Sequence, residues 1–217
     1  IKIKKPGSPV YGFNNWYYAY GESNFDQIIS DAKLQVELSC GIENKPFEVV
    51  DDCWQIHSCS GPWIPNEKFG NMKKLADEIK EIGARPGIWV RLLHNRDTAI
   101  TEDMRILRGG KRQYLDPTHP DAEQFILDSY RYQYRAGYRL FKMDYVSPLL
   151  HVKHFHDLTA TPYGVLSRLV ERVREATGPD AVVLGCSLPL ECGADIAPAM
   201  RIAVDIHNYF SHVSWIA

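Results

Sequence analysis

The chain has 217 residues, of which 45% are apolar and 24% are charged, a composition typical of a soluble globular protein with one large domain. Its formal net charge is -2 and its sequence pI is ≈ 6.5, which excludes a broad positive field for nucleic acid or anionic membranes. The opening IKIKK is too short and too polar for a signal peptide, and no apolar run reaches transmembrane length. We therefore expect no nucleic-acid partner and no membrane partner, and the compartment stays open.

Five cysteines, an odd number, are spread along the chain: Cys40, Cys53, Cys59, Cys186 and Cys192. Without a zinc-like CxxC pair, they indicate neither a disulfide framework nor a structural zinc site. A bridge between Cys53 and Cys59 is conceivable, but free buried thiols are the simpler interpretation. The histidines of HVKHFH, at 151, 154 and 156, lack a carboxylate at a ligand spacing, so we do not expect them to bind a metal.

Short apolar runs that predict strands alternate along the chain with stretches of helical period. The predicted strands are Val10–Trp16, Phe47–Cys53, Pro86–Leu92, Arg139–Tyr145, Ala181–Cys186 and Met200–Ile206. The predicted helices between them are Asn24–Leu38, Met72–Ile82, Asp121–Arg135 and Tyr163–Ala176. Gly83, Gly137 and Gly178 follow three of these helices, where C-terminal caps belong. This alternation predicts an α/β fold with a parallel sheet and helices on its outer side.

Two architectures fit such a pattern: an open doubly wound sheet and a (β/α)8 barrel of the TIM type. A glycine-rich phosphate loop, which a doubly wound nucleotide enzyme would carry after its first strand, is missing. A barrel normally has eight strands and about 250 residues, and this chain supplies six. We therefore expect residues 1–217 to be an incomplete barrel forming a catalytic domain, truncated after about six βα units, within a longer protein.

The segment FKMDYV places two charges in an apolar run that reads as a strand. Because side chains alternate along a strand, Lys142 and Asp144 should share one face, and Phe141, Met143 and Tyr145 should share the other. Asp144 falls at the carboxyl end of its strand, which is where ligands bind in parallel βα folds. The segment therefore predicts a site at this end of the sheet.

Polar or aromatic side chains recur at the ends of other predicted strands: Asn14, Trp16, Asp51, Asp52 and Asp205. Arg201 shares the face of Asp205 and should lie deeper. A single aspartate at a strand end is more often a helix cap or an ion-pair partner, but four of them suggest a common site. Glycoside hydrolysis needs two carboxyl groups on opposite sides of a sugar, and Trp16, Trp54 and Trp63 could provide an apolar face for the ring.

Five motifs in this order resemble a known group of enzymes: GFNNW, VDDCW, KMDY, GCSLPL and RIAVD. They are similar to the retaining α-galactosidases and α-N-acetylgalactosaminidases of glycoside hydrolase families 27 and 36. The segment FGNMKKLADEIKEIGARPGIWV is also similar to the second helix and third strand of that group. The resemblance runs from about residue 11 to about residue 210 and implies a TIM-type barrel.

The resemblance implies a role for each matching residue. Asp144 would be the nucleophile and Asp205 the acid/base. The substrate-binding residues would be Trp16, Asp51, Asp52, Lys142, Cys186, Ser187 and Arg201. The expected partner is an oligosaccharide or glycoconjugate with a terminal α-linked galactose, and neither a metal nor a cofactor is needed.

Two departures from the group's pattern bear on specificity. Ser187 stands where many α-galactosidases have a glutamate, with Leu190 retained, and the smaller side chain could admit a 2-acetamido group, so α-N-acetylgalactosaminidase activity is an alternative. Arg91 stands where an acidic or small residue is expected. The missing last strands and β-sandwich domains leave a second alternative, a non-catalytic sugar-binding or structural fragment, and the two unpaired sheet edges could favour homo-oligomers.

Overall fold

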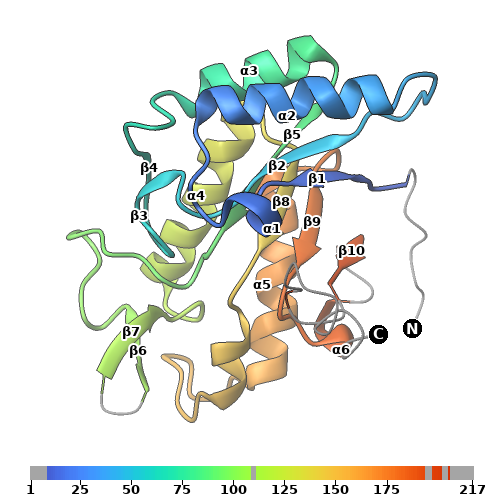
Figure 1. Cartoon of the computed structure of the whole chain (residues 1–217). Coiled ribbons are helices and arrows are strands. Elements are labelled where there is room, and N and C mark those ends of the chain that lie inside the picture. The colour runs from blue at the N-terminus through green and yellow to red at the C-terminus, as the bar shows by residue number, and fades with distance from the viewer. Residues whose placement is uncertain (1–8, 109–110, 194–196, 202–204, 206–217) are drawn as a thin grey trace, which may run out of the picture.

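The computed structural model of the protein describes residues 9–108, 111–193, 197–201 and 205. Six parallel strands form one sheet at its centre (Figure 1). They are β1 (Gly12–Asn14), β2 (Phe47–Val50), β5 (Arg85–Val90), β8 (Leu140–Met143), β9 (Val182–Gly185) and β10 (Ala199–Met200). All neighbouring pairs are parallel. Each of the six predicted strands is therefore represented, although the last prediction extends over residues 202–204 and 206, which lie outside the described residues.

The order of the strands decides between the two predicted architectures. A doubly wound sheet changes the direction in which strands are added at a switch point. Here each strand lies beside the strand that precedes it in the chain, through all six. This is the arrangement of a (β/α)8 barrel, so the predicted fold class is confirmed. No seventh or eighth strand of this sheet occurs among the described residues.

Four long helices cover the outer face of the sheet (Figure 1). They are α2 (Phe25–Leu38), α3 (Met72–Ile82), α4 (Pro120–Ala136) and α5 (Pro162–Thr177). Each helix contacts the next one along the chain, so they form a single layer. Their bounds differ from the predicted ones by one residue at most, because the apolar period and the caps both mark the ends.

Capping contacts explain where α2 and α3 begin and where α3 ends. The side chains of Asn24 and Asn71 accept hydrogen bonds from the backbone N–H groups of Gln27 and Lys74 at the starts of α2 and α3. Gly83 ends α3 at a φ of 103°, a left-handed conformation that glycine adopts without steric cost. These contacts satisfy helix-end groups that would otherwise have no partner.

The main hydrophobic core lies between the helices and the sheet. In α3 the residues Met72, Leu75, Ala76 and Ile79 are all buried, at the spacing that places side chains on one helical face. Phe141 and Met143 of β8 face this core and are fully buried. The helix layer therefore fixes the direction in which alternate residues of each strand point.

The inner face of the sheet changes character along the strands. Near their amino ends, Phe47, Val49 and Leu140 form a small apolar cluster, and the Arg85 guanidinium lies 4.0 Å from the centre of the Phe47 ring. Toward the carboxyl ends, the inner positions become charged. The apolar cluster thus forms a floor beneath the polar end of the sheet.

Several short elements were not predicted from the sequence. They are α1 (Trp16–Ala19), the 3-10 helix η1 (Ser147–His151), α6 (Leu190–Gly193), the hairpin of β3 (Gln55–His57) and β4 (Ser60–Pro65), and the hairpin of β6 (Arg105–Arg108) and β7 (Lys111–Leu115). The two hairpins follow β2 and β5, at the carboxyl ends of those strands. Among the described helices, none combines the length and the apolar character that a membrane crossing demands.

Candidate active site

A buried ion pair joins two strands that are not neighbours. Lys142, on β8, donates to Oδ2 of Asp51, just after β2, at 2.6 Å, although β5 lies between the two strands. Asn14 at the end of β1 donates to the same oxygen at 2.7 Å. Burial lowers the pKa of Lys142, but the charge of Asp51 and its hydrogen bond outweigh this and raise the pKa overall. Lys142 is therefore a fixed cation on the inner face.

Asp52 holds the segment that follows it. Its carboxylate accepts from the backbone N–H groups of Cys53 at 2.7 Å and Cys59 at 2.9 Å. The Gln55 side chain donates to it at 2.6 Å, and the Ser58 hydroxyl at 3.3 Å. Asp52 is 3% exposed. Through these hydrogen bonds Asp52 positions the turn leading into the β3–β4 hairpin, and its contact with the substrate stays a prediction.

Asp144 lies directly after β8, and both of its oxygens have donors. The Trp89 indole Nε1 donates to Oδ2 at 3.1 Å, and the Tyr145 backbone N–H donates to Oδ1 at 2.8 Å. Asp144 is 7% exposed. Two donors on a nearly buried carboxylate fix its orientation. This is the arrangement that a nucleophilic or basic carboxylate needs.

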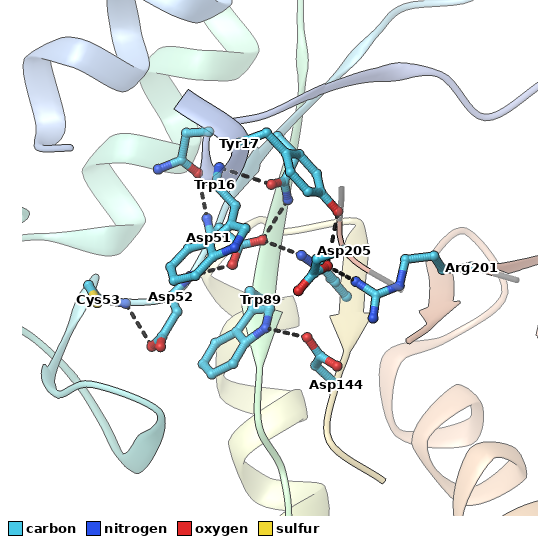
Figure 2. Close-up of polar contacts among 12 residues, drawn as sticks. Trp16, Tyr17, Asp51, Asp52, Cys53, Trp89, Asp144, Arg201 and Asp205 are labelled. Carbon is cyan, nitrogen blue, oxygen red and sulfur yellow. Dashed lines mark hydrogen bonds and ion pairs between the residues drawn. The ribbon is translucent and has the colours of Figure 1, made fainter. Parts of the chain in front are cut away.

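Asp205 is held by two residues that come from opposite edges of the sheet, Tyr17 after β1 and Arg201 after β10 (Figure 2). Its Oδ1 accepts from the Tyr17 hydroxyl at 3.2 Å and forms an ion pair with the Arg201 guanidinium. The side chain of Asp205 is 48% exposed and that of Arg201 is 22% exposed, in agreement with the predicted greater depth of Arg201. Among the described residues, Oδ2 of Asp205 has no hydrogen-bond partner, so it can meet a ligand.

Electrostatic effects show that these groups share one region. Burial raises the pKa of the Cys186 thiol to about 12, while the charges of Lys142, Asp144 and Arg201 also act on it. Both Asp144 and Asp205 raise the pKa of Tyr145, although burial is its largest cause. The structure therefore brings Asp51, Lys142, Asp144, Cys186, Arg201 and Asp205 together at the carboxyl ends of the strands.

Two predicted binding residues lie at the edge of this region. Trp16 begins α1, is half-buried, and its backbone N–H donates to the Asn14 side chain at 3.0 Å. Ser187 follows β9 in a left-handed conformation with a φ of 57° and is exposed. No contact of Ser187 with the carboxylates is seen in the described part of the chain. Its role stays a prediction.

Several residues of the site were not identified from the sequence. Tyr17 could have been suspected from the NNWYY run, and Trp89 from its place on the inner face of the PGIWV strand. Tyr145 was assigned to the wrong face. It is 43% exposed because its positive φ of 56° ends the alternation of β8 and turns the side chain to the mouth of the barrel.

Two further expectations, on the tryptophans and on the cysteines, need correction. Trp54 is fully buried in the outer core and Trp63 is 8% exposed, so Trp54 offers no face to a sugar. All five cysteines are free, but Cys40 is exposed and only Cys186 and Cys192 are buried. The described part of the chain holds no group of three or more His, Cys, Asp or Glu side chains arranged for a metal ion.

A (β/α)8-type barrel with carboxylates gathered at its mouth is an architecture shared by many glycoside hydrolases. No protein-family profile matches the sequence. The fold is similar to an α-galactosidase from Thermus thermophilus in complex with stachyose, with a TM-score of 0.75 and 22% identity, over 96% of this chain and 46% of that one. It is also similar to a GH36 α-galactosidase from Geobacillus stearothermophilus, with a TM-score of 0.70 and 16% identity, over 90% of this chain and 30% of that one.

A third similar structure is a GH27 β-L-arabinopyranosidase from Geobacillus stearothermophilus in complex with arabinose. Its TM-score is 0.63 at 18% identity, over 90% of this chain and 53% of that one. The sequence resemblance to families 27 and 36 is thus matched by structures from both families. The chain spans less than half of each of the two α-galactosidases. At these identities the likeness establishes the fold.

Proposed function

We propose that this chain forms the catalytic part of a retaining glycosidase that removes terminal α-linked galactose. The observation that carries the proposal is that Asp144 and Asp205 lie in one region, where both act on Tyr145, together with the buried Lys142–Asp51 pair at the carboxyl ends of the strands (Figure 2). The similar solved structures support it, because two of those enzymes are α-galactosidases.

Asp144 acts as the nucleophile in this proposal. Its oxygens are oriented by Trp89 and by the Tyr145 backbone, and one of them attacks the anomeric carbon. The bond to the leaving oxygen breaks as the ester bond to Asp144 forms, while Asp205 gives its proton to the leaving oxygen. The products of this step are a glycosyl ester on Asp144 and the free alcohol.

Water completes the reaction. The Asp205 carboxylate removes a proton from a water molecule, whose oxygen attacks the anomeric carbon and releases Asp144. Two displacements return the sugar in its original configuration. Arg201 and Tyr17 position Asp205 by holding Oδ1, which leaves Oδ2 for the proton transfers.

The remaining residues bind the sugar in this proposal. Lys142 and Asp51 provide charged hydrogen-bonding groups at the buried end, where one missing sugar hydroxyl would leave a partner unsatisfied. Trp16 covers the ring from α1, and Cys186 lines the wall between Lys142 and Arg201. In the similar structures, the bound molecules include stachyose and p-nitrophenyl α-D-galactopyranoside, which suggests the same class of substrate here.

A second candidate is hydrolysis of terminal α-linked N-acetylgalactosamine. Ser187 is small and exposed at the end of β9, which leaves room for a 2-acetamido group. Rates on the two para-nitrophenyl glycosides separate the candidates. If the pocket argument holds, Ser187→Glu should shift the preference toward galactose.

Azide rescue tests the assignment of both carboxylates. In Asp144→Gly, azide should restore release of nitrophenol from para-nitrophenyl α-galactopyranoside and give the β-galactosyl azide, because azide replaces the nucleophile in a single displacement. In Asp205→Gly, azide should attack the intermediate and give the α-galactosyl azide. Asp77→Asn, on the exposed face of α3, is the matched control and should retain the starting activity.

Other results would redirect the proposal. Full activity of Asp144→Asn would remove Asp144 from the reaction. A well-folded chain that binds the galactoside and never turns it over would support the non-catalytic sugar-binding alternative.

A further inference from the structure

Arginine side chains gather in the segment that follows β5. Arg91 and Arg96 come shortly after the strand, and Arg105 begins β6. In the described part of the chain, none of the three forms an ion pair with a carboxylate. Arg105 donates to the backbone carbonyls of Asn95 at 3.0 Å and Gln113 at 3.4 Å. The positive charge of this segment is therefore not neutralised by ion pairing.

Arg91 is fixed at the rim of the candidate active site. Its guanidinium lies 4.2 Å from the centre of the Tyr145 ring, and Tyr145 directly follows Asp144. Its Nη1 donates to the Cys59 carbonyl at 3.3 Å, while its buried Nε has no partner. A guanidinium has five N–H donors, so most of its donor capacity remains unused.

His94 lies in the same positive surroundings. Burial lowers its pKa first, and the charge of Arg91 lowers it further, with smaller effects from Arg96 and Arg105. Its ring Nδ1 is buried and has no hydrogen-bond partner in the described structure. Unpartnered buried polar groups are costly. Arg91 and His94 therefore form a polar position beside Tyr145, in which the Arg91 guanidinium has no ion-pair partner among the described residues.

We propose that Arg91 and His94 form a binding position for an anionic group on the leaving-group side of the substrate. A carboxylate, sulfate ester or phosphate ester has the acceptors that a guanidinium binds in pairs. The transferred sugar would occupy the buried end, near Lys142 and Asp51. Tyr145, 43% exposed, marks the open rim, so a group that reaches Arg91 belongs to the part projecting from the pocket. This inference rests on the proposed function.

The test uses two aryl α-galactosides that differ in charge and little in shape, para-carboxyphenyl and para-carbamoylphenyl. The intact chain should have a kcat/KM on the order of tenfold higher for the carboxylate, since a charge-assisted hydrogen bond is the stronger kind. In Arg91→Met the ratio of the two kcat/KM values should fall to about one. In Arg91→Lys it should lie between that value and the ratio of the intact chain. Arg131→Met, which removes a positive charge from the surface of α4, should leave the ratio unchanged. Added salt should reduce the ratio.

Direct binding separates this inference from the proposed function. Calorimetry of both glycosides with Asp144→Asn reports the charge preference whether or not turnover occurs. Binding without hydrolysis by the intact chain would refute the glycosidase and leave the Arg91 preference standing. Equal affinity for the two glycosides, binding of neither one, or a ratio that survives Arg91→Met would overturn the inference. Arg91-dependent inhibition by galactose 6-sulfate, without a preference among the aryl groups, would overturn the leaving-group placement in favour of an anion on the transferred sugar.

Discussion

Glu48 makes a pH-dependent contribution to stability that can be isolated by one substitution. It lies on β2, is fully buried and faces α2, where the Gln35 side chain donates to its Oε2. Its Oε1 has no partner in the described structure. Burial raises the pKa of Glu48 to about 9, with a further contribution from the charge of Asp31. The folded protein therefore keeps Glu48 protonated at neutral pH.

The sign and size of the effect follow from linkage. An unfolded glutamate has a pKa of about 4.3, so between that pH and the folded pKa the folded state binds one more proton than the unfolded state. As the pH rises through this interval, the free energy of unfolding should then decrease by about 1.4 kcal/mol per pH unit. Between about pH 5 and about pH 8, the loss attributable to Glu48 amounts to about 4 kcal/mol.

Glu48→Gln removes the titration and keeps the shape of the side chain. We expect the variant to be more stable than the starting protein at about pH 8, with the advantage shrinking steadily as the pH falls to about 5. Denaturant unfolding followed by circular dichroism at several pH values measures the difference. Titrations common to both proteins cancel in this comparison. Asp31→Asn should lower the upper end of the pH interval over which this slope holds, because it removes a charge that raises the folded pKa of Glu48.

A difference between the two proteins that does not change with pH would refute the reasoning. It would mean that the Glu48 carboxyl titrates alike in the folded and unfolded states. Burial would then not disfavour its ionised form, and the account of how α2 packs on β2 would have to change.

Three further predictions concern the site. Lys142→Met leaves Asp51 buried without its cation and should lower the free energy of unfolding by about 3 to 5 kcal/mol. The double variant Lys142→Met/Asp51→Leu should recover part of this loss, and equal losses in the single and double variants would contradict the prediction. Asp52→Asn should cost about 1 to 3 kcal/mol and speed proteolysis in the turn after Cys53, whereas an unchanged cleavage rate would argue against its positioning role. Trp89→Phe removes a donor to Asp144 and should lower kcat on an aryl α-galactoside on the order of tenfold, with little change in KM. A change confined to KM would show that Trp89 does not act by orienting Asp144.

The sequence by itself determined most of the regular structure. The bounds of α3 follow from its apolar period and from the caps at Asn71 and Gly83, which are local features. The alternation of strands and helices likewise predicted the parallel sheet. Placement of Asp51 and Asp144 just after strands also followed from local pattern, because strand ends can be recognised without knowing which strands are neighbours.

Only the tertiary structure decided which side chains meet. The sequence predicted that Lys142 and Asp144 share a face, but it did not predict that Lys142 pairs with Asp51 across the intervening β5. The sequence also did not predict the burial of Trp54 against Trp63 or the stacking of Arg91 on Tyr145. Contacts of this kind depend on strand order, on register and on single backbone angles such as the positive φ of Tyr145. The spacing of residues in the sequence reports the periodicity within one helix or strand, whereas contacts between side chains of different elements depend on how those elements pack together.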